Sequence, residues 1–82
     1  MRGMVAWYHH ELRVALIERI AGFTVGTLEE GLISPGDVLS GDLRTFGCSR
    51  LNNETTGKSL LFDVEAEALT EEEATDLLAF IR

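Results

Sequence analysis

Residues 69–81 read LTEEEATDLLAFI, and this stretch contains a complete helix start. Thr70 suits the N-cap position, and Glu73 can reach back to the Thr70 N–H, which is the capping-box arrangement. Glutamates at 71–73 lie where the helix dipole is positive. We therefore predict a helix over 70–82. Its apolar stripe comprises Ala74, Leu77, Leu78 and Ile81.

Turn signals precede this helix every 8–12 residues, which is typical of short β-strands. Ser34-Pro35-Gly36-Asp37 predicts a type II turn, because proline presets the first corner and glycine supplies the positive φ of the second. Residues 53–57 predict a hairpin loop between strands at 48–52 and 58–65.

Two further segments favour extended structure. Residues 23–28 form one, with Gly26 indicating a bulge or bend, and residues 38–45 form another, interrupted at Gly41. The phenylalanines at 23, 46 and 62 are expected in the core.

Residues 12–20 fit two interpretations. A strand would place Leu12, Val14, Leu16 and Ile20 on one face, with Ala15, Ile17 and both arginines on the other. A helix would instead align Leu12, Ala15, Leu16 and Ile20, with Gly22 as its stop. The β-branched content and the continuation into residues 23–25 favour the strand.

Residues 1–11 are predicted as either an N-terminal arm or an edge strand. Trp7 and Tyr8 in this segment either plug an open barrel end or anchor an interaction, and we favour the plug. Phe80 lies off the centre of the helix stripe and is the third candidate interaction anchor.

The chain is therefore predicted to be one domain, 1–82, of the mainly β α+β class. We expect a β-rich body over 12–65, formed by a small, strongly bent antiparallel sheet or a partly open barrel of SH3-like or OB-like size. This body has four or five strands and is followed by the C-terminal helix. The helix stripe should pack on the sheet face that carries Leu60, Phe62 and Val64.

The net charge of −7 works against binding to phosphate backbones, since that affinity comes from Lys and Arg. One cysteine excludes an internal disulfide framework and suits a reducing compartment, so a cytoplasmic location is expected. No run approaches the roughly 20 apolar residues of a membrane span, and no membrane role is expected.

The patterns that suggest chemistry are incomplete. Gly57-Lys58-Ser59 resembles the tail of a phosphate-binding loop, but Asn52 stands where its first glycine is needed. His9-His10-Glu11 has Val14 where a metalloprotease has its second histidine. Cys48 is interpreted as a half-buried strand residue. We predict no catalytic, cofactor-binding or metal-binding residues and no cofactor.

These observations favour a small acidic, non-catalytic binding module that docks to a protein partner or to a second copy of itself. One alternative is a nucleic-acid-related role, by acidic mimicry of DNA or by an arginine face, although nucleic-acid binding is disfavoured by the charge. A small enzyme is the least favoured alternative. The basic residues considered for one face are Arg13, Arg19, Arg44, Arg50 and Lys58.

Overall fold

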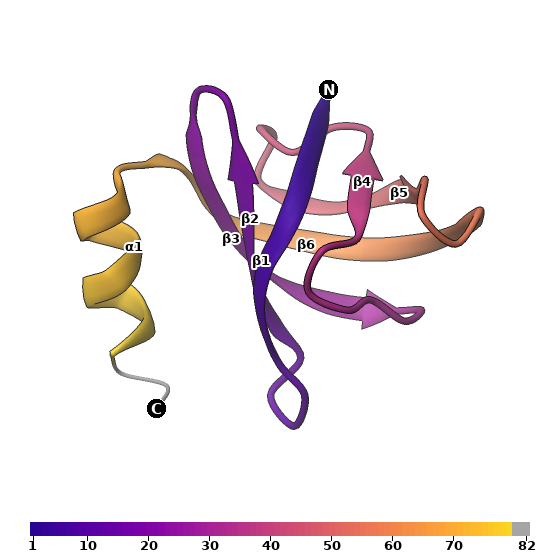
Figure 1. Cartoon of the computed structure of the whole chain (residues 1–82), viewed down its shortest axis with the longest axis horizontal. Coiled ribbons are helices and arrows are strands. Elements are labelled where there is room, and N and C mark those ends of the chain that lie inside the picture. Colours follow the sequence, from indigo (N-terminus) through magenta and orange to yellow (C-terminus); the bar gives the residue numbers. More distant parts are fainter. Residues whose placement is uncertain (80–82) are drawn as a thin grey trace.

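Within residues 1–79, which the computed structural model describes, six antiparallel strands close into a barrel, followed by one short helix (Figure 1). The order around the barrel is β1-β2-β3-β6-β5-β4, and β4 pairs back with β1. The predicted small β-barrel with one C-terminal helix is confirmed. The elements are β1 (Arg2–His9), β2 (Val14–Arg19), β3 (Gly22–Glu30), β4 (Val38–Ser40), β5 (Gly47–Asn53), β6 (Lys58–Leu69) and α1 (Glu71–Leu78).

The N-terminal segment supplies the strand that closes the barrel. β1 pairs with β2 on one side and with β4 on the other. Residues 2–9 are thus neither a loosely held arm nor an edge strand, and they raise the strand number above the predicted four or five. Closure leaves no free sheet edge in the described barrel.

A shift of register near Ala6 decides which β1 side chains enter the barrel. Val5 pairs with Ile17, whereas Trp7 pairs with Leu16 and the next residue, Tyr8, pairs with Ala15. Because paired residues share a face, Val5 and Tyr8 point inward and Trp7 points outward.

The strand interpretation of residues 12–20 is confirmed for residues 14–19, but its predicted buried face is wrong. Ala15 and Ile17 are fully buried, whereas Leu12 and Ile20 are exposed in the turns at either end of β2. Apolar residues occupy both faces of this segment, so the alternation alone does not show which face is inside.

The barrel interior is filled by apolar side chains. Leu60, Phe62 and Val64 belong to this core, so the prediction that α1 packs on them is wrong: the barrel closes over them instead. Phe62 is fully buried, whereas Phe46 is 66% exposed, contrary to its predicted core position. The core cluster comprises Val5, Ala15, Ile17, Leu28, Ile33, Leu39, Leu43, Leu51, Leu60, Phe62 and Val64.

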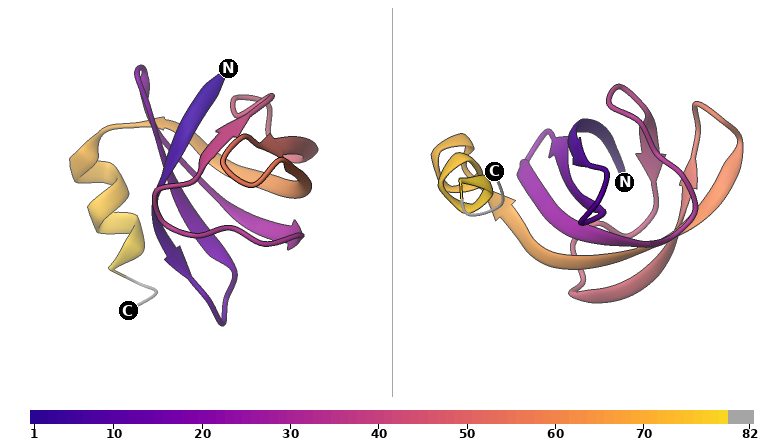
Figure 2. Two further views of the ribbon diagram at one scale, coloured as in Figure 1. Left: turned by 45° about the vertical axis from the view of Figure 1, so that its right-hand side comes forward. Right: turned by 90° about the horizontal axis from the view of Figure 1, so that it is seen from below.

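Helix α1 lies outside the barrel, against β3 and β6 (Figure 2). Its buried residues are Ala74 and Leu78, which form no part of the barrel cluster, and Leu77 is partly exposed. The capping box is present, because the Glu73 N–H donates to Thr70 Oγ1 and the Thr70 N–H donates to Glu73 Oε1, each at 3.1 Å.

Thr70→Ala should lower the free energy of unfolding by about 1 kcal/mol, because it removes the side-chain acceptor of this cap. Chemical denaturation checks the value. Thr75→Ala in the same helix is the control, and it should cost nothing or stabilise slightly, since alanine favours a helix interior. Equal losses in the two variants would show that the cap does not contribute.

Candidate functional site at one end of the barrel

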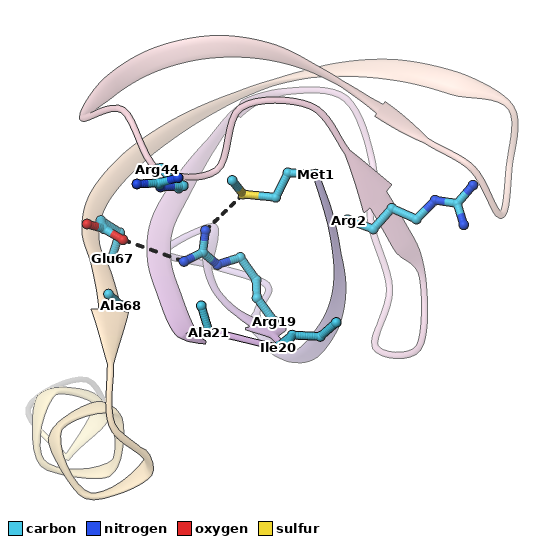
Figure 3. A pocket seen from close by; sticks show the side chains of 8 residues that line it. All are labelled: Met1, Arg2, Arg19, Ile20, Ala21, Arg44, Glu67 and Ala68. Carbon is cyan, nitrogen blue, oxygen red and sulfur yellow. Dashed lines mark hydrogen bonds and ion pairs between the residues drawn. The ribbon is translucent and has the colours of Figure 1, made fainter.

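A hollow of about 550 Å3 opens at the end of the barrel where the chain begins (Figure 3). Its walls come from the start of β1, the β2–β3 turn, the loop between β4 and β5, and the end of β6. We refer to this hollow as the barrel mouth. It is lined by Met1, Arg2, Arg19, Ile20, Ala21, Arg44, Glu67 and Ala68.

Arg19 lies at the centre of the barrel mouth because of its position in β2. It follows Ala15 and Ile17 on the inward-facing side, since alternate strand residues share a face. Gly3 on the neighbouring strand leaves the space that this arrangement needs. A Cβ at Gly3 would lie 2.5 Å from Ile17 Cγ2 and 3.1 Å from Arg19 Cγ. The Arg19 side chain is only 4% exposed.

The Arg19 guanidinium group has few partners for a buried cation. Its Nη2 lies 3.5 Å from Glu67 Oε2, and its Nη1 donates to Met1 Sδ at 2.9 Å, a weak acceptor. Its Nε is buried and has no hydrogen-bond partner among the described residues. Burying a charge is costly unless it is well paired, and this guanidinium group is poorly paired for its burial.

Arg44 lies at the barrel mouth on the loop between β4 and β5, and the preceding residue of this loop, Leu43, packs in the barrel core. Leu43 is fully buried, and its carbonyl accepts a hydrogen bond from Thr24 Oγ1 at 3.1 Å. Asp42 Oδ1 accepts the N–H groups of Arg44 and Thr45, each at 3.0 Å. The Arg44 side chain is therefore held on a fixed loop at the rim, while remaining exposed to solvent.

Hydrogen bonds from the Thr45 side chain and N–H, with the Arg44 N–H, lower the pKa of Asp42 to about 2. Because the folded-state pKa is depressed, the loop gains stability from this carboxylate at pH above about 3.8 and loses it as the pH falls through about 2. A carbon-detected NMR titration should give an Asp42 midpoint near 2. A midpoint near 4 would show that the loop does not hold these bonds in solution.

The walls around the two arginines are apolar. Ile20 is fully exposed at the tip of the β2–β3 turn, and Met1 is about half exposed. Ala21 and Ala68 complete the wall. Among the described residues, Glu67 is the one carboxylate of the lining, which includes no histidine, cysteine, serine or threonine. The arrangement is suited to binding by charge and apolar contact.

The predicted interaction anchors lie elsewhere. Tyr8 packs against the core near the end of β1 that is opposite to the barrel mouth, and Trp7 lies half-buried on the outer face with its ring 5.9 Å from that of His9. Phe80 is outside the described residues. The structure therefore does not bring the two described anchors to the barrel mouth, and their role stays a prediction.

The incomplete motifs occupy structural positions. His9 Nδ1 accepts the Leu12 N–H at 3.0 Å within the β1–β2 turn, and Gly57 has a φ of 77° in the β5–β6 hairpin. Among residues 1–79, no group of three or more His, Cys, Asp or Glu is placed to hold a metal ion. Cys48 is exposed, contrary to its predicted half-buried position, because it pairs with Asp63 on the outer face of the barrel.

The five basic residues considered for one face are dispersed. Arg13 lies at the opposite end of β2 from Arg19 and donates to the carbonyls of Leu28 and Gly31. Arg50 donates to Ser59 across the β5–β6 pair. Only Arg19 and Arg44 of this set line the barrel mouth.

No family model, no curated protein and no solved structure matches this chain. Across the described part of the chain, no helix is long and apolar enough to cross a membrane.

Proposed function

We propose that this chain is a small, non-catalytic binding module that docks a protein partner at the barrel mouth. The observation that carries the proposal is the inward-facing, underpaired guanidinium group of Arg19 beneath an exposed apolar rim. Arginine is one of the residue types enriched among those that contribute most to binding at protein interfaces, and such residues lie in pockets from which water is excluded.

Because apolar side chains fill the barrel, a partner binds at its surface. Phe62, Leu39 and Leu51 occupy the interior with no more than 1% exposure, as part of an apolar core that fills the barrel. A partner must therefore contact the ends or the outer faces of the barrel. The barrel mouth combines a hollow of about 550 Å3 with the buried, underpaired guanidinium group of Arg19, whereas the hollow beside the exposed Leu32 is smaller, about 260 Å3, and its cation is Lys58.

Ile20 is the most exposed large apolar residue of the barrel mouth, so a docked partner would bury it. It is fully exposed on the turn that joins β2 to β3, and it shares the lining of the barrel mouth with Met1 and that of a neighbouring hollow with the outward-facing Met4. Covering an isoleucine side chain contributes roughly 1.5–3 kcal/mol through the hydrophobic effect. We place this module in the cytoplasm, because an exposed single cysteine suits a reducing compartment.

Comparative capture from a lysate of the source cells tests the proposal. The bait is the tagged full chain, with Ile20→Ser as the test variant and Leu32→Ser as the control, since Leu32 is also exposed but lies outside the barrel mouth. We expect a protein that is retained by the parent and by Leu32→Ser but lost with Ile20→Ser. Identical retention by all three baits would contradict docking at the barrel mouth.

Light scattering after size exclusion, over a range of concentrations, distinguishes an external partner from a second copy. If the partner is a second copy, the mass should double at high concentration and Ile20→Ser should restore the monomer. A parent that stays monomeric limits the proposal to an external protein.

A further inference from the structure

We infer that the barrel mouth recognises a carboxylate group carried on a short apolar body, such as the C-terminal residue of a partner chain with an aliphatic side chain. This inference rests on the proposed function, because it names the chemistry that a partner would present at the same site.

The donor groups for such a ligand are already in place. Arg19 holds its guanidinium group in the barrel mouth with one long contact to Glu67 and one to a thioether, so most of its five N–H groups lack a strong acceptor. Charge-assisted bonds from arginine to a carboxylate are about twice as strong as neutral ones. The low exposure of Arg19 strengthens them further, because water screens them less.

The charges of the lining match one negative charge. Of the described side chains in the lining, Arg19 and Arg44 contribute two cations and Glu67 one anion, which leaves a single positive charge. Arg2 adds none, since its side chain turns away from the barrel mouth and pairs with Glu54 at 3.1 Å (Figure 3). A monoanionic carboxylate therefore neutralises the site, whereas a phosphate dianion would leave excess negative charge beside Glu67.

The residues that form the walls indicate the chemistry and size of the rest of the ligand. Ile20, Ala21 and Ala68 offer apolar contact and no side-chain hydrogen-bonding groups. The volume of about 550 Å3 falls within the roughly 300–1,000 Å3 that is usual for small-molecule sites. A carboxylate with an aliphatic body of leucine size uses both the guanidinium groups and these walls.

NMR titration of the 15N-labelled full chain tests this inference with defined probes. Hexanoate and N-acetyl-leucine carry the predicted chemistry as a free acid and as a chain-end mimic. Hexanol and N-acetyl-leucine amide are their uncharged counterparts, and inorganic phosphate is the alternative anion. We expect the two carboxylates to cause saturable shifts at Arg19 Nε–H and at the Ile20 and Ala21 amides, and the other three probes to cause none.

Two variants that each remove one positive charge show whether hexanoate binds at the barrel mouth. Arg44→Gln should weaken hexanoate binding about tenfold, since one of two cations is lost. Arg50→Gln makes the same change of charge on β5, away from the barrel mouth, and should leave the affinity unchanged. Equal weakening by the two variants would point to the overall charge of the protein and overturn the inference.

Two further results would also overturn the inference: no saturable shift with either carboxylate up to about 10 mM, well above a millimolar Kd, or phosphate binding as tightly as hexanoate. Capture that still depends on Ile20 while carboxylates fail to bind would reject the carboxylate chemistry and keep the proposed docking site. Loss of Ile20 dependence would reject the docking site itself.

Discussion

Gly26→Ala is expected to prevent folding, or to lower the free energy of unfolding by at least about 3 kcal/mol, at the upper end of overpacking costs. A Cβ at this position would lie 2.3 Å from the Asp63 carbonyl oxygen and 2.6 Å from Phe62 Cε2. The first contact is with the backbone of β6, so relief requires β3 and β6 to separate where the register already shifts between Val25 and Gly26. Circular dichroism with chemical denaturation measures the loss.

Gly3→Ala is the matched control, because Gly3 is also a strand glycine without positive φ. Its Cβ would meet the side chains of Ile17, Arg19 and Leu43, which can adjust more readily than a backbone carbonyl. We expect a smaller loss of stability than in Gly26→Ala. A stable, folded Gly26→Ala variant would show that β3 and β6 are not as close in solution as in this barrel.

Phe62→Ala is expected to lower the free energy of unfolding by about 3–5 kcal/mol, the usual cost of removing a buried phenyl ring. Phe62 is fully buried in the barrel core, beside the space that Gly26 leaves open. Small domains have only about 5–15 kcal/mol in total, so this variant should be partly or wholly unfolded at 37 °C. Thermal unfolding followed by circular dichroism is the measurement.

Phe46→Ala provides the control for the same chemical change. Phe46 is 66% exposed on the loop before β5, and its truncation should cost less than about 1 kcal/mol. If the two variants melted at the same temperature, Phe62 would not be in the core and the described barrel would be wrong.

Apart from the class of small β-barrel with one C-terminal helix, the features that the sequence predicts correctly are local ones. The capping box at Thr70 depends on residues three positions apart, and both of its hydrogen bonds are present. The predicted turn is also present: Gly36 has a φ of 95°, and the Asp37 N–H donates to the Ser34 carbonyl at 3.0 Å. Gly26 coincides with a shift of register, as its interpretation as a bulge requires. Such signals depend on φ preferences and short hydrogen bonds, which neighbouring residues determine.

The features that it predicts incorrectly depend on segments far apart in the chain. Whether Leu60 and Phe62 face a helix or the barrel interior depends on closure between β1 and β4, which no local pattern indicates. The same closure decides that Ala15 and Ile17 lie inside, since both faces of β2 carry apolar residues.

The make-up of the barrel mouth depends both on local strand alternation and on closure of the barrel. The strand interpretation of residues 12–20 already places Arg19 on the same face as Ala15 and Ile17, and this was the available signal for an inward-facing arginine. Its proximity to Arg44 and Glu67 follows only from the closed barrel. From the sequence, both arginines are candidates for one basic sheet face, whereas the structure brings them together at the end of the barrel.

If Arg19 is held in the barrel mouth for binding rather than for folding, Arg19→Met should be no less stable than the parent, and thermal unfolding at pH 7 measures this. Methionine keeps the apolar stem and removes the underpaired charge, and replacing a poorly paired buried charge by an apolar residue is often neutral or stabilising. We predict a melting temperature equal to or above that of the parent, together with loss of the hexanoate response. A fall in stability of several kcal/mol, of the size seen when a buried ion pair is broken, would make Arg19 a structural residue and reject its role in binding.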